Sequence, residues 1–551
     1  MTDELFVSLG HNSSAVFARD GVVIRGYEQE RIDRKKSSSA YPRDAIELAV
    51  GDGGADVAYV SHWFDDLTLR NNKYLDLDHL ESVAGVVVGL NDGFTHHDAH
   101  AQSAISFFVS NGGRADDAHV VVIDGFGTNQ ECFSVYYAVH PFTTRPKLMH
   151  RTYGYSRSLG LMYQYTTEYL GLKPNQDEYK LLGYEAHVLE YVPRAHLIGI
   201  TDAIQRQADF HAWMMLDSTE KPSLHGKLID YNALKFAKAY WWEIADRWRK
   251  LFPPNLPEAG VRACVAFCAQ YFLEQCVIML LERAIPKSFG PAPHLILTGG
   301  SFYNVKLSRQ VKLRTGRRVF SHPLAGDQGA AMGFSPDLTC AGLTWGARTI
   351  LGRDGQLPVG VEVVDASEWV PRAAMLLDEG HVVNVVRGGM EFGPRALCNT
   401  TTFAMPTPAM VSLINRLNER DDVMPMAPVI TRRRAMQLFR HDELLDVPVS
   451  DRFMITTVAF KDAPSPLHMG VAHRDPLEDV WTARPQIVDE GDDVHRLLCL
   501  LPDQVLINTS FNYHGEPIVF TEDDACRTHE MQCFRARTLG LQEPTTLLVR
   551  S

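Results

Sequence analysis

The sequence lacks the features of a membrane or secreted protein. No uninterrupted apolar run approaches the roughly 20 residues that a membrane-spanning helix requires. The first residues, MTDELFVSLGHNSS, contain neither the basic nor the apolar segment of a secretory signal. The nine cysteines include no CxxC pair, which fits reduced thiols rather than a disulfide framework. We therefore expect a cytoplasmic protein that does not use a membrane.

Positive charge is also scarce. Lys and Arg number 54 against 67 Asp and Glu, so the formal net charge is −13 at pH 7. This balance argues against a broad electrostatic surface for nucleic acid or anionic lipid, although a local basic groove stays open. What is present is an ordinary globular composition, 45% hydrophobic and 22% charged. A chain of 551 residues is too long for one hydrophobic core, so at least two domains are expected.

The N-terminal region alternates short β-branched runs with helical patterns. LFVSLG, GVVIRGYE, VAYVSHWF and HVVVIDGFG are predicted strands, and YPRDAIELAV and HAQSAISFFV are predicted helices between them. Two segments, LFVSLGHNSSAVF and VVVIDGFGTNQECFSVYYA, share one design, in which a strand enters a Gly-containing polar turn and a second strand leaves it. This duplicated hairpin resembles the phosphate-binding hairpins of the actin/Hsp70/sugar-kinase ATPase superfamily, where Gly lets the backbone approach a phosphate.

The rest of the chain predicts a long helical region and then a second α/β unit. Residues 205–285 have helical patterns, and HLILTGGSFYNVKLS predicts a strand, a Gly-Gly turn and a helix start. The later runs HVVNVVRGG, TTTFAMP, FMITTVAF and QVLINTSFN are predicted strands. We predict a first domain over residues 1–345, a linker over residues 346–364 and a smaller second domain over residues 365–551.

The stretch HHDAHAQS places three histidines at a predicted helix start. On a helix, His96 and His100 stand at i and i+4, so both imidazoles can face one cation. His97 is turned away by about 100° on such a helix. Asp124, at a strand end, and Asp327, in a Gly-containing turn, are further candidate ligands, and such a set favours Fe(II), Mn(II) or Zn(II) over Mg(II). A polar helix start with solvated histidines is the alternative.

Taken in order, the motifs resemble one family. HxxxH, DGFG, LTGGSFYN and GDQGAAMG are similar to the metal- and ATP-binding half of the NodU-type carbamoyltransferases, and the same half resembles the tRNA threonylcarbamoyl-transfer ATPases. Further matches are SLGHNSSA, ERIDRKK, SLGLMYQYTTEYLGLKPNQDEYKLLGYEA, RGGMEFGPRALCNTT, MAPVI and LINTSFNYHGEPIV. Together they span most of the chain.

The resemblance implies an α/β protein with a duplicated actin/Hsp70/sugar-kinase-like ATPase domain followed by a smaller YrdC-like α/β domain. The second domain would bind carbamoyl phosphate and make carbamoyl adenylate from ATP. The first would transfer the carbamoyl group to an acceptor hydroxyl on a specialised metabolite, sugar or hydroxymethyl-pyrimidine nucleotide. The implied cofactor is Fe(II) or a similar divalent ion, with Mg²⁺ accompanying ATP as an option. Nucleic acid is a disfavoured partner, and a homodimer is compatible with the sequence.

The resemblance also assigns roles to individual residues. It implies metal ligands at His96, His100, Asp124 and Asp327. It implies an ATP or adenylate site at Gly125, Gly127, Gly299, Gly300 and Asn304. It implies catalytic roles for His11, as general base or acceptor orienter, and for Lys36, near the carbamoyl group. It implies a carbamoyl phosphate site at Arg395, Arg420, Arg484, Asn508, Asn512 and His514. Read from residues alone, His11 could be a turn histidine and Lys36 part of a solvated charge run.

The sequence departs from the family pattern in the second domain. Where family members have K-x-R-E-x-x-R-P, this chain has NERDDVMP, so Asn418 and Met424 replace two cations and Arg420 remains. The D-G-T-A-R turn has become DPLEDVWTAR. Because each charged hydrogen bond contributes roughly 1.5–3 kcal/mol, such losses should weaken a phosphate site. The three arginines of TRRR could compensate, or could be a solvated helix face.

Two other functions remain open at this stage. One is a kinase or ATPase of the same superfamily, which HxxxH and FGPRAL…NTSFN speak against because phosphoryl transfer to a sugar needs neither. The other is a non-catalytic nucleotide-binding partner subunit, which the missing cations favour. A kinase would leave ADP, whereas adenylate chemistry would leave AMP.

Overall fold

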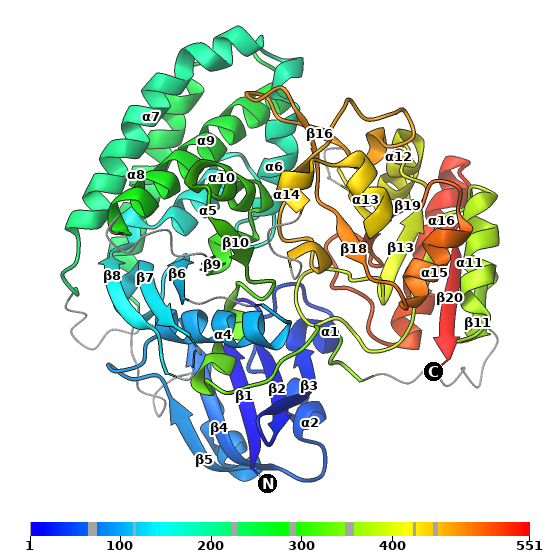
Figure 1. Ribbon diagram of the computed structural model, residues 1–551, viewed down its shortest axis with the longest axis horizontal. Helices are drawn as coiled ribbons and strands as arrows, with labels where there is room; N and C mark the ends of the chain where they lie inside the picture. The colour runs from blue at the N-terminus through cyan, green and yellow to red at the C-terminus, as the bar shows by residue number, and fades with distance from the viewer. Residues whose placement is uncertain are drawn as a thin grey trace. The chain divides into compact units, whose positions relative to one another are not determined.

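The computed structural model describes residues 2–63, 74–113, 117–140, 142, 144–222, 229–285, 294–347, 357–421, 426–444 and 450–550. The chain forms two compact units (Figure 1). Unit 1 contains residues 1–24, 37–341 and 476–479, and unit 2 contains residues 25–36, 342–475 and 480–551. Each unit combines helices with a sheet core, so the predicted α/β class is confirmed.

Unit 1 begins with a five-stranded sheet in the order β3-β2-β1-β4-β5. Its strands are β1 (Asp3–Leu9), β2 (Ser14–Arg19), β3 (Val22–Glu28), β4 (Ala55–His62) and β5 (Ala84–Gly89). β1 pairs antiparallel with β2 and parallel with β4, and β4 pairs parallel with β5.

The second sheet repeats this plan. Its order is β10-β9-β6-β7-β8, built from β6 (Asp117–Ile123), β7 (Glu131–Val139), β8 (Lys147–Tyr153), β9 (His294–Thr298) and β10 (Arg318–Ser321). β6 pairs antiparallel with β7 and parallel with β9, as β1 does with β2 and β4. The predicted duplication, with one antiparallel hairpin at the start of each half, is confirmed.

Helices surround these sheets (Figure 1). They are α2 (Arg43–Val50), α3 (Leu77–Val83), α4 (His96–Ser110), α5 (Leu159–Tyr169), α6 (Glu178–Ala186), α7 (Arg194–Asp217), α8 (Tyr231–Arg249), α9 (Glu258–Ala284) and α10 (Val305–Thr315). Among the described residues, only α9 is long and apolar enough to cross a membrane, and 83% of its most apolar 18-residue window is buried in the protein. Burial of this kind is typical of a core helix.

Unit 2 is built on a seven-stranded mixed sheet in the order β11-β20-β12-β13-β19-β14-β18. The strands are β11 (Val361–Asp365), β12 (Val383–Val386), β13 (Thr400–Ala404), β14 (Ala427–Thr431), β18 (Gln486–Val488), β19 (Val505–Ser510) and β20 (Thr545–Arg550). Its helices are α1 (Gln29–Asp33), α11 (Trp369–Asp378), α12 (Pro408–Leu417), α13 (Arg432–Leu438), α14 (His441–Leu444), α15 (Asp493–Leu500) and α16 (Glu522–Leu539). One buried core packs Trp369 and Leu377 against Phe403, Leu506 and Leu547.

Three features of unit 2 and its borders differ from the sequence predictions. FMITTVAF is not a full strand, because only its residues Val458–Ala459 form β15, which pairs in a small sheet with β17 (Trp481–Ala483) beside β16 (His473–Arg474). The last residues of the predicted linker form β11, because they pair with β20. Residues 25–36 belong to unit 2 and residues 476–479 to unit 1, an exchange that the sequence does not signal.

Candidate functional site

The N-terminus of α4 is built by a capping box. Thr95 is the N-cap residue, and Asp98 returns its carboxylate to the Thr95 backbone N–H at 2.8 Å. Such a box fixes the first helical residue, which is His96, as HHDAHAQS predicted. His96, His97 and His100 are all buried, so the alternative of solvated histidines is wrong.

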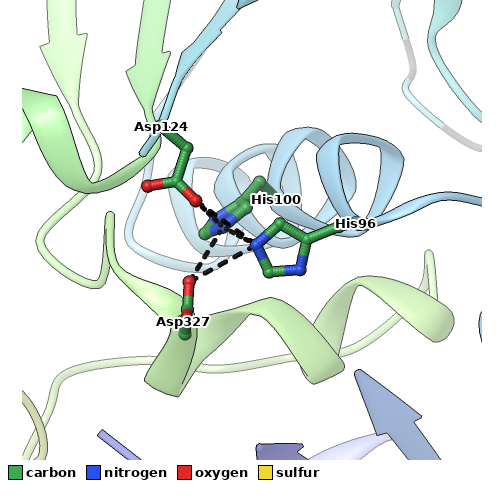
Figure 2. A group of neighbouring side chains, drawn as sticks. All are labelled: His96, His100, Asp124 and Asp327. Carbon is green, nitrogen blue, oxygen red and sulfur yellow. Dashed lines mark hydrogen bonds and ion pairs between the residues drawn. The ribbon is translucent and has the colours of Figure 1, made fainter. Parts of the chain in front are cut away.

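Four of the predicted site residues meet beside this helix end. One ligand atom from each of His96, His100, Asp124 and Asp327 lies within 4.8 Å of the others. His96 Nε2 lies 3.0 Å from His100 Nε2, 3.4 Å from Asp124 Oδ2 and 3.3 Å from Asp327 Oδ1. Figure 2 shows the two imidazoles on successive turns of α4 and the two carboxylates facing them.

The imidazoles and carboxylates of this cluster shift one another's pKa. Burial alone would lower the pKa of His96, but hydrogen bonds and charge from Asp124 and Asp327 outweigh it and raise the pKa to about 10. Burial would raise the pKa of Asp327, but its bonds to His100 and His96 hold that pKa below the usual range. His97 is different, because burial and the nearby charge of Arg151 lower its pKa well below the ordinary value.

Two buried charged residues that the sequence did not single out support the helix end. Glu131, the first residue of β7, accepts hydrogen bonds from the His97 backbone N–H at 2.8 Å and from the Thr95 hydroxyl at 3.0 Å. Arg151 on β8 lies 3.2 Å from the Glu131 carboxylate and 2.7 Å from Asp98. Since Glu131 lies at a strand start far from α4 in sequence, no local pattern could have identified it.

The turns after β6 and β9 supply close backbone approaches. Asp124 Oδ1 accepts a hydrogen bond from the Gly300 N–H at 3.0 Å, which fixes the carboxylate that faces His96. Gly299 has φ of +90°, and a Cβ there would lie 2.4 Å from the Ile123 carbonyl oxygen. A Cβ at Gly127 would lie 2.8 Å from the His96 ring. Both glycines are therefore required for packing beside the cluster.

The other predicted adenylate residues differ in their surroundings. A Cβ at Gly125 would meet nothing within 4 Å, so the backbone there borders open space. Asn304 is the N-cap of α10, accepting from the Leu307 N–H at 3.0 Å. Its amide also donates to Gln270 at 2.7 Å. The structure thus gives Asn304 a capping role that the family resemblance alone did not suggest.

The two predicted catalytic residues belong to different units. His11 is exposed in unit 1 on the turn after β1, where its ring stacks on Trp63 with centroids 5.5 Å apart. The preceding Gly10 borders the cluster, because a Cβ there would lie 2.6 Å from Asp327 Oδ2. Lys36 is half-buried at the end of the segment that joins unit 2.

Unit 2 contains a pair of neighbouring arginines. Arg395 lies in the FGPRAL loop, and Arg484 follows β17. Burial, and next the positive charge of Arg395, lower the pKa of Arg484 well below its usual value. Across the described residues, no carboxylate forms an ion pair with Arg484. A buried guanidinium with a second positive charge near it is typical of an anion site.

The asparagines and Arg420 of the predicted donor site bond mainly to the protein. Asn508 is buried and donates to the Ala396 carbonyl at 3.0 Å and to Gln486 at 2.6 Å. Arg420 donates to Thr509 at 2.8 Å and to Asn512 at 2.9 Å. These side chains hold loops of unit 2 together.

The region of the missing cations has a different construction. The backbone N–H of His514 donates to the Asn418 carbonyl at 3.1 Å. Asn418 is 1% exposed, donates to the Ile414 carbonyl at 3.0 Å and accepts from Gln532 at 2.9 Å. Asn418 is therefore a structural cap of α12, not a weakened phosphate ligand. Met424 lies outside the described residues.

Sequence comparison places the chain in one family. Family models of the carbamoyltransferase N-terminus and C-terminus match residues 90–335 and 374–541. The chain belongs to the carbamoyltransferase family. The predicted membership of the NodU-type carbamoyltransferases and the predicted class of enzyme, a carbamoyltransferase, are confirmed.

Relatives of this carbamoyltransferase match at moderate identity. The nodulation protein NolNO of Sinorhizobium fredii is 26% identical, covering 94% of this chain and 76% of that protein. The 3'-hydroxymethylcephem-O-carbamoyltransferase of Amycolatopsis lactamdurans is 32% identical, covering 36% of this chain and 39% of that protein. One solved structure is similar over 62% of this chain and 98% of its own, at 12% identity and a TM-score of 0.32. It is component A of the (R)-2-hydroxyglutaryl-CoA dehydratase of Acidaminococcus fermentans.

Proposed function

We propose that this carbamoyltransferase activates carbamoyl phosphate with ATP to carbamoyl adenylate and transfers the carbamoyl group to an acceptor hydroxyl. The observation that carries the proposal is the cluster of His96, His100, Asp124 and Asp327 in unit 1. Phosphoryl transfer to a sugar has no need of two buried imidazoles, whereas a carbamoyltransferase that must expel a charged adenylate phosphate has a use for a metal there.

The cluster fits a divalent metal ion. For metal–ligand bonds of about 2.1 Å, donors lie about 3.0 Å apart at adjacent octahedral corners and about 3.4 Å apart at tetrahedral ones. The observed separations from His96 Nε2 are 3.0, 3.4 and 3.3 Å, and those from His100 Nε2 to the two carboxylates are longer, 3.9 and 3.6 Å. Two nitrogen and two oxygen donors favour Fe(II) or a similar ion over Mg²⁺, which we assign to ATP instead. When bound, such an ion would offset negative charge on the departing phosphate.

The protein groups of unit 1 then hold and orient the reactants. Gly125 offers backbone close to the cluster, where a phosphate can approach without meeting a side chain, whereas Gly127 lets the turn pack against the His96 ring. His11, exposed beside Gly10, would accept the proton of the acceptor hydroxyl as that oxygen attacks the carbamoyl carbon. The alkoxide oxygen forms the new C–O bond, the bond from the carbamoyl carbon to the adenylate oxygen breaks, and AMP leaves.

The arginines of unit 2 support activation of the donor. Arg395 and Arg484 lie near enough for their charges to interact, and guanidinium groups recognise phosphate by planar, bidentate hydrogen bonds. Water releases phosphate from carbamoyl phosphate, a carbamate oxygen attacks the α-phosphorus of ATP, and pyrophosphate leaves. Activation is needed because carbamate itself is a poor electrophile.

The acceptor is proposed to be a small molecule with a free hydroxyl, such as a specialised metabolite, a sugar or a nucleotide. One relative is named for a hydroxymethyl acceptor, which supports an alcohol as the acceptor class. The net charge of −13 disfavours nucleic acid, because phosphate backbones are bound mainly by positive surface.

Paired variants test the two sites separately. His100→Ala should lose bound Fe(II), measured per chain after anaerobic loading, yet retain carbamoyl-phosphate-dependent pyrophosphate release. Arg484→Met should retain the iron and lose pyrophosphate release. His97→Gln, beside the cluster on α4, and Arg496→Met, whose side chain is 58% exposed, are matched controls that should keep both properties.

Two results would contradict the proposal. One is an iron content in His100→Ala equal to that of the wild type. The other is undiminished pyrophosphate release by Arg484→Met, which would mean that donor activation does not use the arginine pair.

A further inference from the structure

The short helix α1 (Gln29–Asp33) reaches one backbone position in the FGPRAL loop of unit 2. The Glu28 carboxylate accepts a hydrogen bond from the Gly393 N–H at 2.9 Å. The Arg31 guanidinium donates to the Gly393 carbonyl at 2.6 Å. Glu28 and Arg31 also form an ion pair at 3.0 Å and are 3% and 4% exposed. Both backbone polar groups of Gly393 are therefore held by buried side chains from a distant part of the chain.

The other side of the same loop is held by a third buried charge. One oxygen of Glu391 accepts the backbone N–H groups of Leu397, Asn399 and Thr400, each at 2.9 Å. Pro394 has a fixed φ. With Gly393 bonded on one side and residues 397–400 on the other, the backbone that carries Arg395 has little freedom to move.

Burying these charges is costly, and the geometry shows how the cost is offset. Removing an ion from water costs several kcal/mol unless partners replace the solvent. Arg31 lies 2.7 Å from Glu30 in addition to its pair with Glu28. Burial would lower the pKa of Arg31, but the charges of Glu28, Glu30 and Glu391 outweigh it and raise the pKa, so the guanidinium stays charged. Apolar residues of similar volume would fill such a core without the free-energy cost of desolvating charges.

The same segment also holds a second loop. Arg34 donates to the Ile518 carbonyl at 2.8 Å and to the Pro517 carbonyl at 2.9 Å. These residues follow His514 and the NTSFN segment in the chain. ERIDRKK thus bonds to the backbone of the loop that carries Arg395 and of the segment that follows His514.

We propose that Arg31 is a positioning residue that orients Arg395 for the donor's phosphate group by fixing the peptide groups of Gly393. This inference rests on the proposed function, in which Arg395 binds carbamoyl phosphate. Arg31 acts through the loop backbone and touches no reactant. A guanidinium is needed because it reaches Gly393, Glu28 and Glu30 at once, and an ammonium group lacks the fixed fork that makes this possible.

A double-mutant cycle tests the proposal. Arg31→Lys should raise the KM for carbamoyl phosphate at least 10-fold and leave the KM for ATP within about 2-fold. In an Arg395→Met background the same change should have no further effect on the carbamoyl phosphate KM, because its consequence passes through Arg395. Arg372→Lys, which alters an ion pair with Glu362 in the same unit, is the control and should leave both KM values unchanged.

Inorganic phosphate binding, measured by calorimetry, repeats the cycle without turnover. It keeps the inference testable if wild-type protein shows no carbamoyl-phosphate-dependent reaction, a result that would count against the proposed function alone. Should Arg31→Lys fail to fold, as judged by circular dichroism and its thermal midpoint, Glu28→Gln takes its place in the cycle. The positioning role would be overturned if the losses of affinity caused by Arg31→Lys and Arg395→Met multiplied in the double variant. It would also be overturned if Arg31→Lys folded and bound phosphate with wild-type affinity.

Discussion

Replacing Glu131 by Gln should loosen the end of α4 that carries the metal-cluster histidines. Glu131 Oε1 accepts the His97 N–H, while Oε2 accepts the Thr95 hydroxyl and faces Arg151 at 3.2 Å. A Gln keeps only one acceptor oxygen, so its NH₂ group must face a donor. Breaking a buried ion pair costs about 3–5 kcal/mol. Because Arg151 keeps Asp98 at 2.7 Å, we expect a loss in the free energy of unfolding of about 3 kcal/mol.

The same variant should bind metal more weakly. Groups that orient metal ligands typically change affinity about 10–100-fold when they are removed. We expect a loss of that size in an anaerobic Fe(II) titration of Glu131→Gln. Unfolding in urea, followed by fluorescence, measures the loss in the free energy of unfolding. Glu190→Gln, with a side chain 63% exposed, is the control and should change stability by less than about 0.5 kcal/mol.

The double variant with Arg151→Met sharpens this prediction. With both Glu131 and Arg151 replaced, neither residue is left as an unpaired buried charge. The loss in the free energy of unfolding of the double variant should therefore be smaller than the sum of the two single losses by more than about 1 kcal/mol. A Glu131→Gln protein whose stability lies within about 1 kcal/mol of wild type and whose iron affinity is unchanged would refute the reasoning.

Three further predictions follow from buried groups elsewhere. Burial lowers the pKa of His211 to about 4. The unfolded chain therefore binds the extra proton first, so the free energy of unfolding should fall as pH drops from about 6.5 to 4. His211→Gln should reduce the pH dependence of that free energy by up to about 1.4 kcal/mol per pH unit. An unchanged pH dependence in urea unfolding would contradict this. Gly299→Ala should weaken ATP binding and destabilise the protein, because its Cβ would meet the Ile123 carbonyl oxygen at 2.4 Å; calorimetry with ATP checks it, and wild-type affinity would disprove it. Asn418→Lys should lower the thermal midpoint without lowering the KM for carbamoyl phosphate, because position 418 is buried and its amide is bonded; a gain in donor affinity would show that a cation there still reaches the site.

Local pattern was enough to predict the two histidines of the metal cluster and the duplicated hairpins. His96 and His100 were identifiable because their i, i+4 spacing follows a helix start, and the two glycine turns because each interrupts a pair of apolar strands. These features depend on residues that are close in sequence.

The supporting contacts could not be predicted, because they join residues far apart in the chain. Glu131 stands at a strand start with no motif around it, and the helical spacing only turns its partner His97 away from the predicted metal. Arg31 stands in the sequence only as one residue of the family match ERIDRKK, and nothing in that motif indicates that it is buried against Gly393. Asn304 and Asn508 have the residue type expected of a ligand-binding amide, yet their bonds to Leu307, Gln270 and Gln486 could be known only from the fold.

The most direct test of the central claim is the nucleotide product. Purified iron-loaded protein is incubated with radiolabelled ATP, with and without carbamoyl phosphate and without acceptor, and the nucleotides are separated. We predict AMP and pyrophosphate that depend on carbamoyl phosphate. ADP as the product, or nucleotide that binds without turnover, would contradict donor activation through an adenylate.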